Sequence, residues 1–184
     1  MLRTFSSGAL LSFLPCLLSA QGDLWLARLK NQEFQAVKDR TGLIVVEMPR
    51  KDWRNEPGKD PVLLSLSQRR KEATVVVEQQ ALQQPLQAED ITELFGQLEI
   101  DRLKGLNPEG EGFSAKVFAL DGHRVVVVQF TRKGPEGLER VRQYSYPEGI
   151  RLFRLTCVAT TARFAKYEPL FAHMAASLRR ADGT

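Results

Sequence analysis

Residues 124–131, RVVVVQFT, decide the fold, because a run of four valines is typical of a strand buried on at least one face. Two glycines and a proline follow at 133–137, so the chain is expected to turn there and to return over 138–146. A second turn at 147–149 leads into 150–159, where apolar residues alternate as in a half-buried strand. We therefore predict three consecutive antiparallel strands.

After residue 160 the spacing of the apolar residues changes to that of a helix. Four residues have the i, i+3, i+4, i+7 spacing of one buried stripe: Phe171, Met174, Ala175 and Leu178. Pro169 fits a helix only in its first turn, so the helix is expected to begin close to it. Arg179 and Arg180 suit its C-terminal end. Such a helix buries its stripe by packing across the sheet.

Two further strand pairs are predicted earlier in the chain. Residues 33–49 have the pattern of a β-hairpin, and 62–67 are expected to pair with 73–79. Between them, the polar residues 50–61 indicate a surface loop in which Trp53 is a single aromatic anchor.

A second helix is expected after a connector at 81–89, because Asp90 and Glu93 resemble a capping box. Its predicted buried stripe consists of Ile91, Leu94, Phe95 and Leu98. Glycines and a proline then end the helix, and the chain returns to a strand at 113–120. The following Asp121-Gly122 is a strong hairpin signal, which leads directly into 124–131.

Residues 155–178, LTCVATTARFAKYEPLFAHMAASL, resemble the closing element of the Mog/PsbP-like fold family. In that family a strand ends in small and hydroxyl residues, an aromatic follows, a proline-aromatic pair opens the last helix, and a serine closes it. The matching positions here are Thr160, Thr161, Phe164, Pro169, Phe171, Ser177 and Leu178. Pro49 with Trp53 is similar to an earlier element of the family. The resemblance implies an α+β fold, an α/β/α sandwich with a central antiparallel sheet, and it carries over no catalytic residue.

Residues 1–20 have the layout of a secretory signal peptide, with one positive charge at Arg3, an apolar centre and a small residue at Ala20. An uncleaved anchor or a buried N-terminal helix is the alternative. We expect a mature chain that is periplasmic or secreted and has no transmembrane span. Its predicted parts are a lead-in at 21–32, a single domain at 33–180 and a tail at 181–184.

The ionisable and nucleophilic residues show no spacing typical of an active site or a metal site. Cleavage after residue 20 would leave Cys157 as the only cysteine, and we interpret it as a buried strand residue. His123 is expected at a hairpin turn and His173 at the border of a helical stripe, without a Cys or His at ligand spacing. The sequence indicates no enzyme, no cofactor and no metal.

One candidate binding surface follows from the alternation of strand residues. Arg140, Arg142, Tyr144 and Tyr146 should share one face, which with Trp53 makes a hypothetical partner-binding set. Such a face suits an anionic lipid headgroup or an acidic protein segment. Alternatively it is a solvated face, or its side chains pack by their stems against a helix. The net charge of +4 is too small to indicate nucleic acid binding.

These observations favour a non-catalytic secreted or periplasmic accessory protein that binds a protein partner of the cell envelope. The resemblance implies this role, since PsbP-like and DcrB-like proteins bind or assist other proteins. A carrier of a small molecule or lipid is the first alternative, and it would need an apolar cavity between sheet and helix. An uncharacterised enzyme is the second, and it would need a cleft that gathers His123 or His173 with a carboxylate.

Overall fold

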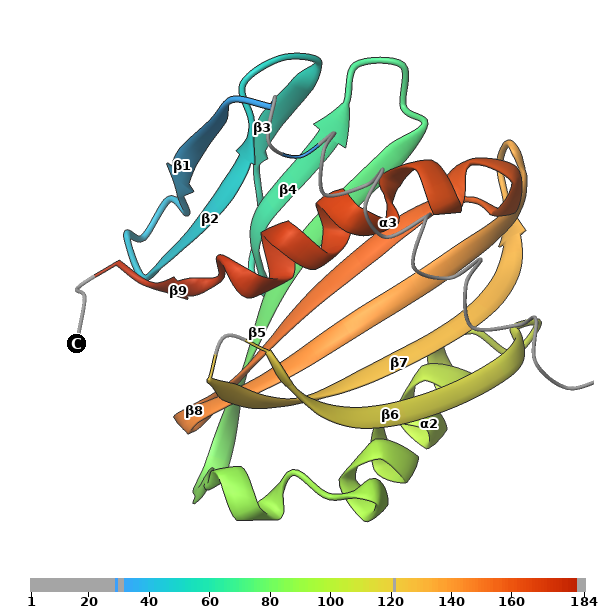
Figure 1. The fold of residues 1–184 in the computed structure, drawn as a ribbon. Helices are drawn as coiled ribbons and strands as arrows, with labels where there is room; N and C mark the ends of the chain where they lie inside the picture. The colour runs from blue at the N-terminus through green and yellow to red at the C-terminus, as the bar shows by residue number, and fades with distance from the viewer. Residues whose placement is uncertain (1–28, 30–31, 121, 182–184) are drawn as a thin grey trace, which may run out of the picture. The chain divides into compact units, whose positions relative to one another are not determined.

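The computed structural model describes Leu29 and residues 32–120 and 122–181. The chain divides into two units, residues 1–32 and 33–184, and all helices and strands labelled in Figure 1 belong to the second. The expected signal peptide at 1–20 and most of the lead-in at 21–32 lie outside the described residues.

The larger sheet is antiparallel and has the strand order β3-β4-β5-β8-β7-β6. Its strands are β3 (Trp53–Pro57), β4 (Val62–Gln68), β5 (Ala73–Leu86), β6 (Glu111–Leu120), β7 (His123–Gly134) and β8 (Gly137–Thr160). The predicted pairing of β4 with β5 and the predicted hairpins β6-β7 and β7-β8 are confirmed. Strand β5 continues to Leu86, where a connector was expected, so that part of the prediction is wrong.

The long strand β8 reverses direction within its length. Its 24 residues would span about 80 Å if straight, yet the Thr161 hydroxyl donates a hydrogen bond to the Leu138 carbonyl at 3.0 Å. Gly149, in the predicted turn, has a φ of +57°, and Figure 1 shows the ribbon returning beside itself. Residues 137–145 pair with β7 and 149–159 with β5. These two arms agree with the predicted succession of antiparallel strands.

A smaller sheet has the order β1-β2-β9, with β1 (Phe34–Lys38), β2 (Ile44–Pro49) and β9 (Arg179–Arg180). The predicted hairpin at 33–49 is therefore confirmed. Its turn is closed by the Asp39 carboxylate, which accepts hydrogen bonds from the backbone N–H groups of Thr41, Leu43 and Ile44. Arg179 and Arg180 do not end a helix as expected, because they pair with β2.

Residues 53–57 form an edge strand, so the prediction of a surface loop there is wrong. Trp53 is only 7% exposed and packs edge-on against the Tyr167 ring, with 6.4 Å between the centroids. The next three residues of β3 are polar and exposed. This polar composition does not indicate a strand in the sequence, because an edge strand needs few apolar residues.

The helix α3 (Thr161–Ala176) covers one face of the larger sheet. The four residues of the predicted stripe are all buried, as expected, although Leu178 lies just beyond the end of the helix. The predicted start near Pro169 is wrong, since the helix begins eight residues earlier. Phe164 and Tyr167 bury their rings in that first part of the helix. This packing compensates for the backbone hydrogen bond that a proline inside a helix cannot make.

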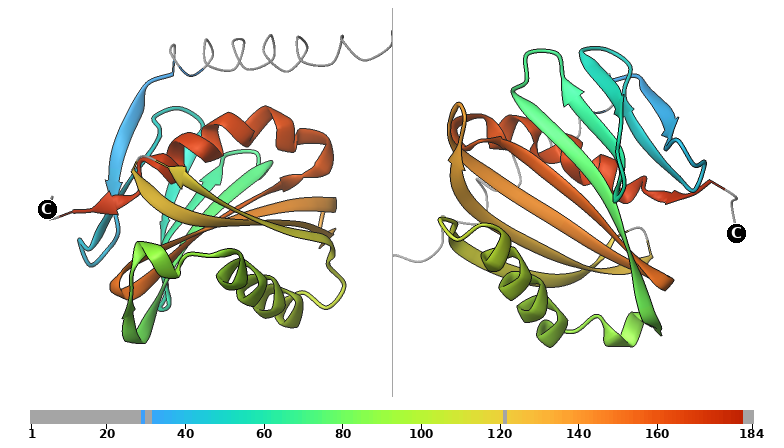
Figure 2. Two further views of the ribbon diagram at one scale, coloured as in Figure 1. Left: turned by 60° about the horizontal axis from the view of Figure 1, so that its bottom comes forward. Right: turned by 180° about the vertical axis from the view of Figure 1, so that it is seen from behind.

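The opposite face is covered by α2 (Glu93–Leu106), which follows the short helix η1 (Ala88–Asp90). Figure 2 shows the sheet between the two helices, which confirms the α/β/α order of layers. The predicted stripe of α2 is only partly correct, because Ile91 is buried and Phe95 is half-buried, whereas Leu94 and Leu98 are 72% and 58% exposed. The residues that the helix buries are Gly96, Glu99, Ile100 and Leu103. Within the described ranges no helix is long and apolar enough to cross a membrane.

Candidate functional site

The predicted Arg-Tyr face lies mostly under α3. Tyr144 and Tyr146 are both buried in the core between the sheet and this helix. The Tyr146 hydroxyl donates a hydrogen bond to the Ala175 carbonyl at 2.7 Å. Of the alternatives for this face, packing against a helix is the one that the structure shows. Tyr146 and the buried Trp53 therefore do not reach the surface of the described part of the chain.

The two arginines of this face pack against the N-terminal half of α3. The guanidinium carbons of Arg140 and Arg142 lie 5.5 and 5.3 Å from the centre of the Phe164 ring, within the range of a cation-π contact. Arg142 also pairs with Glu168 of α3, with 2.6 Å between Nη2 and Oε1. These contacts fix the arginines, yet both side chains keep partial access to solvent.

A cleft of about 270 Å³ lies on the same face, over β6, β7 and the first arm of β8. The contacts of α3 with the larger sheet are mainly to β8 and β5, and Figure 1 shows β6 as the outermost strand. We call this hollow the β6 cleft. It is lined by Ser114, Lys116, Phe118, Val127, Gln129, Arg142 and Tyr144.

The register of the strands explains why these side chains meet. Val127 of β7 pairs with Lys116 of β6 on one side and with Tyr144 of β8 on the other. Residues opposite each other in an antiparallel pair point to the same face. Because alternate residues of β6 share a face, Phe118 stands beside Lys116.

The β6 cleft combines an apolar floor with cations. Val127 and Tyr144 are buried in its floor, and Phe118, which also lines the cleft, is 39% exposed. Burial raises the pKa of Tyr144 to about 12, so its hydroxyl stays protonated at neutral pH. Among the residues that the structure describes, no carboxylate pairs with the exposed Lys116. The cleft therefore suits a ligand group that is apolar in one part and anionic in another.

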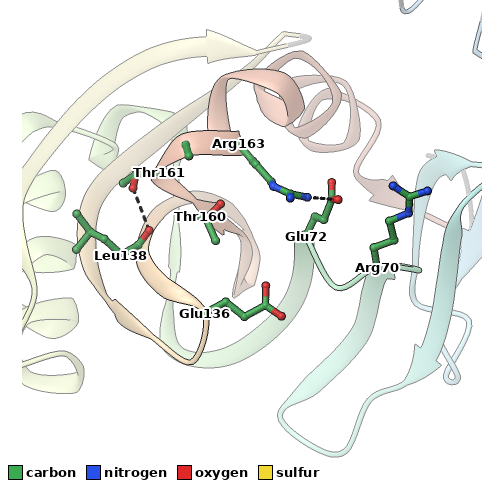
Figure 3. Close-up of a pocket in the computed structure, with 8 residues that line it drawn as sticks. Arg70, Glu72, Glu136, Leu138, Thr160, Thr161 and Arg163 are labelled. Atoms are coloured by element: carbon green, nitrogen blue, oxygen red, sulfur yellow. Dashed lines mark hydrogen bonds and ion pairs between the residues drawn. The ribbon is translucent and has the colours of Figure 1, made fainter.

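A second depression, of about 420 Å³, lies where α3 begins, and Figure 3 shows the side chains around it. Arg163 forms an ion pair with Glu72 across it. The Tyr167 hydroxyl also donates to the Glu72 carboxylate, at 2.6 Å. The hydrogen bonds from Tyr167 and Arg163 lower the pKa of Glu72 to about 2. Since these groups satisfy one another, the depression is better explained as the joint between β5 and α3 than as a binding site.

A buried polar cluster joins α2 to the sheet. The Glu99 carboxylate accepts two hydrogen bonds of 2.7 Å from Arg154, and others from Gln143 and Ser145 at 3.2 and 3.1 Å. Burial opposes the ionised form of Glu99, but hydrogen bonds and charge from Arg154, with a further contribution from Arg102, lower its pKa to about 2. Both partners of the pair are almost completely buried. The cluster is a structural joint, because a ligand has no access to it.

None of the candidate catalytic residues of the sequence lines the β6 cleft. Cys157 is completely buried, and burial raises the pKa of its thiol. His123 is exposed at the start of β7. His173 does meet a carboxylate, with Nε2 3.2 Å from Oε2 of Glu47, but this pair lines neither the β6 cleft nor the depression at the start of α3. Within the described ranges no group of three or more His, Cys, Asp or Glu residues could hold a metal ion.

Sequence reasoning missed Lys116 and Phe118 as site residues, although it placed both in a strand. Their spacing of two residues indicates a common face. The prediction concentrated on arginines and tyrosines, and it could not show which part of the face the final helix leaves open.

No family model and no curated protein match this sequence. Solved structures do match. The cyanobacterial PsbP (CyanoP) of Synechocystis sp. PCC 6803 has a TM-score of 0.63 and 11% identity, and the match covers 81% of this chain and 93% of that one. The Ran-binding protein Mog1p of Saccharomyces cerevisiae has a TM-score of 0.58 and 9% identity, over 82% and 97% of the two chains.

A third similar structure is LpqN of Mycobacterium tuberculosis, which is involved in cell envelope biogenesis. Its TM-score is 0.55 and its identity 12%, over 83% of this chain and 93% of LpqN. At such low identities the likeness concerns the fold and does not transfer a function. The arrangement of sheet and helices and these three structures together show that the chain has the Mog/PsbP-like fold.

Proposed function

We propose that this protein is a non-catalytic accessory protein that binds a protein partner through the β6 cleft. The observation that carries the proposal is the partly exposed Phe118 beside the exposed Lys116, over a floor of buried Val127 and Tyr144. Protein interfaces combine an aromatic centre of this kind with a polar and charged rim. Arg142 also lines the cleft, with its charge paired to Glu168 of α3.

The similar structures support this class of function. Mog1p is a Ran-binding protein, and LpqN is involved in cell envelope biogenesis. Of the residues predicted from sequence, Arg142 and Tyr144 belong to the proposed surface and Arg140 lies beside it.

The proposed role includes export from the cytoplasm to the periplasm or beyond, since residues 1–20 have the pattern of a cleavable signal peptide. Fractionation of a bacterial host that expresses the full chain would test this. Export predicts a periplasmic or secreted product whose mass corresponds to a start near Gln21. A cytoplasmic product that keeps its first 20 residues would contradict it.

Photo-crosslinking tests the binding surface itself. A benzophenone amino acid would replace Phe118 in the full chain, and in a matched control it would replace Leu94, which is exposed on the opposite side of the sheet. We expect one protein to crosslink reproducibly from position 118 and not from position 94. The captured protein, once purified, should bind the wild-type chain in solution. Crosslinking from position 94 alone, or to lipid alone, would contradict the proposal.

A further inference from the structure

The larger sheet ends in two unlike edge strands. Strand β3 has five residues and ends in a proline, so it offers little backbone for pairing. Strand β6 has ten residues and no proline. Within the described ranges, β7 is the only strand that pairs with it. A strand at an edge presents every second backbone N–H and C=O group to its open side, where another chain can pair with it.

We propose that the partner supplies an extended acidic segment, which adds to the sheet as a strand along β6. This inference rests on the proposed function. Strand addition gives affinity through backbone hydrogen bonds and specificity through side-chain pockets at alternate positions. Ser114, Lys116 and Phe118 line the β6 cleft at this alternate spacing. The binding surface and the open edge therefore belong to the same strand.

The side chains at this edge define the chemistry of the segment. Lys116 has no carboxylate partner among the described residues, and Arg142 lies in the cleft behind it. A carboxylate of the added strand would pair with Lys116, and an apolar side chain two residues away would cover Phe118.

The same lysine disfavours a second copy of this chain as the occupant. Exposed lysines on edge strands commonly prevent edge-to-edge association. Antiparallel pairing of two β6 strands near their centres would bring two Lys116 side chains together, and like charges at opposite positions destabilise a pair. The positive charge of Lys116, which would repel a second copy of this chain, would attract an acidic segment.

The register indicates which backbone groups are available. Leu120 and His123 pair next to the two-residue turn, and hydrogen-bonded positions alternate along an antiparallel ladder from there. We infer that Ala115, Val117 and Ala119 point their backbone groups to the open side. Ala119 is exposed, so Ala119→Pro removes one outward N–H group and little packing.

The probe is a nine-residue peptide of alternating glutamate and valine, compared with its lysine-valine counterpart. Both are titrated to millimolar concentration into the ¹⁵N-labelled full chain and followed by NMR. We expect the glutamate peptide alone to slow amide hydrogen exchange at Ala115, Val117 and Ala119. The wild type should bind the glutamate peptide about tenfold more tightly than the lysine peptide, and Lys116→Glu should bind the lysine peptide about tenfold more tightly. A tenfold difference in affinity is about 1.4 kcal/mol. Ala119→Pro should weaken binding of the glutamate peptide, with its melting temperature as the control for folding.

Several outcomes would overturn the inference. The first is binding of both peptides equally or of neither, and the second is exchange protection that lies outside β6. A third is a dimer, seen by light scattering, whose β6 amides are protected without peptide. If the partner crosslinked from position 118 binds both Ala119→Pro and Lys116→Glu like the wild type, the proposed function stands and the added acidic strand is wrong.

Discussion

The layers formed by α3 and α2 cover opposite faces of one sheet, but different forces hold them in place. The α3 layer is an aromatic core, in which the Phe171 ring lies 5.4 Å from Phe164 and 6.1 Å from Tyr167 between centroids. The α2 layer has a smaller apolar cluster and is joined to the sheet by the buried pair of Glu99 and Arg154. Helix α3 is therefore positioned by the packing of apolar rings, and α2 is positioned largely by the contact between Glu99 and Arg154.

This difference explains the orientation of α2. Periodicity of apolar residues favoured a buried stripe with Leu94 and Leu98, but burial of Glu99 turns these leucines to the outside. A buried charge that is well paired specifies one arrangement, because any other leaves Arg154 without its partner. The outer side of α2 is thus the principal competitor of the β6 cleft as a binding surface.

The largest effect is expected in the aromatic layer. Phe171→Ala removes a completely buried ring and should lower the free energy of unfolding by about 4 kcal/mol through lost burial and a cavity. Urea denaturation of the variant and the wild type measures this. Leu94→Ala, on the exposed side of α2, is the control and should change little. A loss below about 1 kcal/mol for Phe171→Ala would mean that α3 is not held by this core.

Breaking the buried pair should have the next largest effect. Glu99→Gln leaves the Arg154 charge buried without a counter-charge, and should cost about 3 kcal/mol of unfolding free energy. The double variant Glu99→Met with Arg154→Leu removes both charges and should recover part of that loss, since buried Gln143 and Ser145 still lose their acceptor. Denaturant unfolding of the three chains tests this. A double variant as unstable as Glu99→Gln would show that the polar contact is not what orients α2.

Acid should weaken the attachment of α2 through protonation of Glu99. The folded-state pKa of Glu99 is about 2, below the ordinary value of 4.5, so its contribution is complete above about pH 5 and is lost as the pH falls toward 2. Between pH 6 and pH 3 the wild type should lose about 2 kcal/mol more than Glu99→Gln. Urea unfolding at both pH values measures the difference. Parallel losses in the two chains would contradict the assignment.

The smallest effect is expected on the outer side of α2. Leu98 is largely exposed, so Leu98→Glu should change the unfolding free energy by less than about 0.5 kcal/mol. Thermal unfolding with Phe171→Ala as the positive control tests this. A loss above about 1 kcal/mol would mean that α2 packs through its leucines after all.

Much of the fold could be predicted from local patterns. The valine run, the Asp121-Gly122 turn and the 147–149 turn indicate strands and hairpins because their signals lie within a few residues. The apolar spacing of 171–178 likewise indicates the buried stripe of α3. The start of α3 could not be predicted in this way, because tertiary packing of Phe164 and Tyr167 overrides the preference of Pro169 for a first turn.

The orientation of α2 and the site could not be read from local spacing. Glu99 and Arg154 are 55 residues apart, and an exposed helix and a helix with one buried charge have similar local patterns. The β6 cleft depends on which strands α3 leaves open, which is a property of the assembled layers. The alternation of strand residues placed Arg142 and Tyr144 on the face of the sheet that carries the β6 cleft. It could not show which part of that face α3 covers and which part stays open.

The most direct test of the account compares the two exposed surfaces in one titration. The purified partner would be titrated by calorimetry into the wild type, Phe118→Asp and Leu98→Asp, all checked for equal melting temperatures. We expect Phe118→Asp to weaken binding at least tenfold, about 1.4 kcal/mol, and Leu98→Asp to leave the affinity within about twofold. Loss of binding in Leu98→Asp with unchanged affinity in Phe118→Asp would contradict the β6 cleft as the binding surface and assign that role to the outer side of α2.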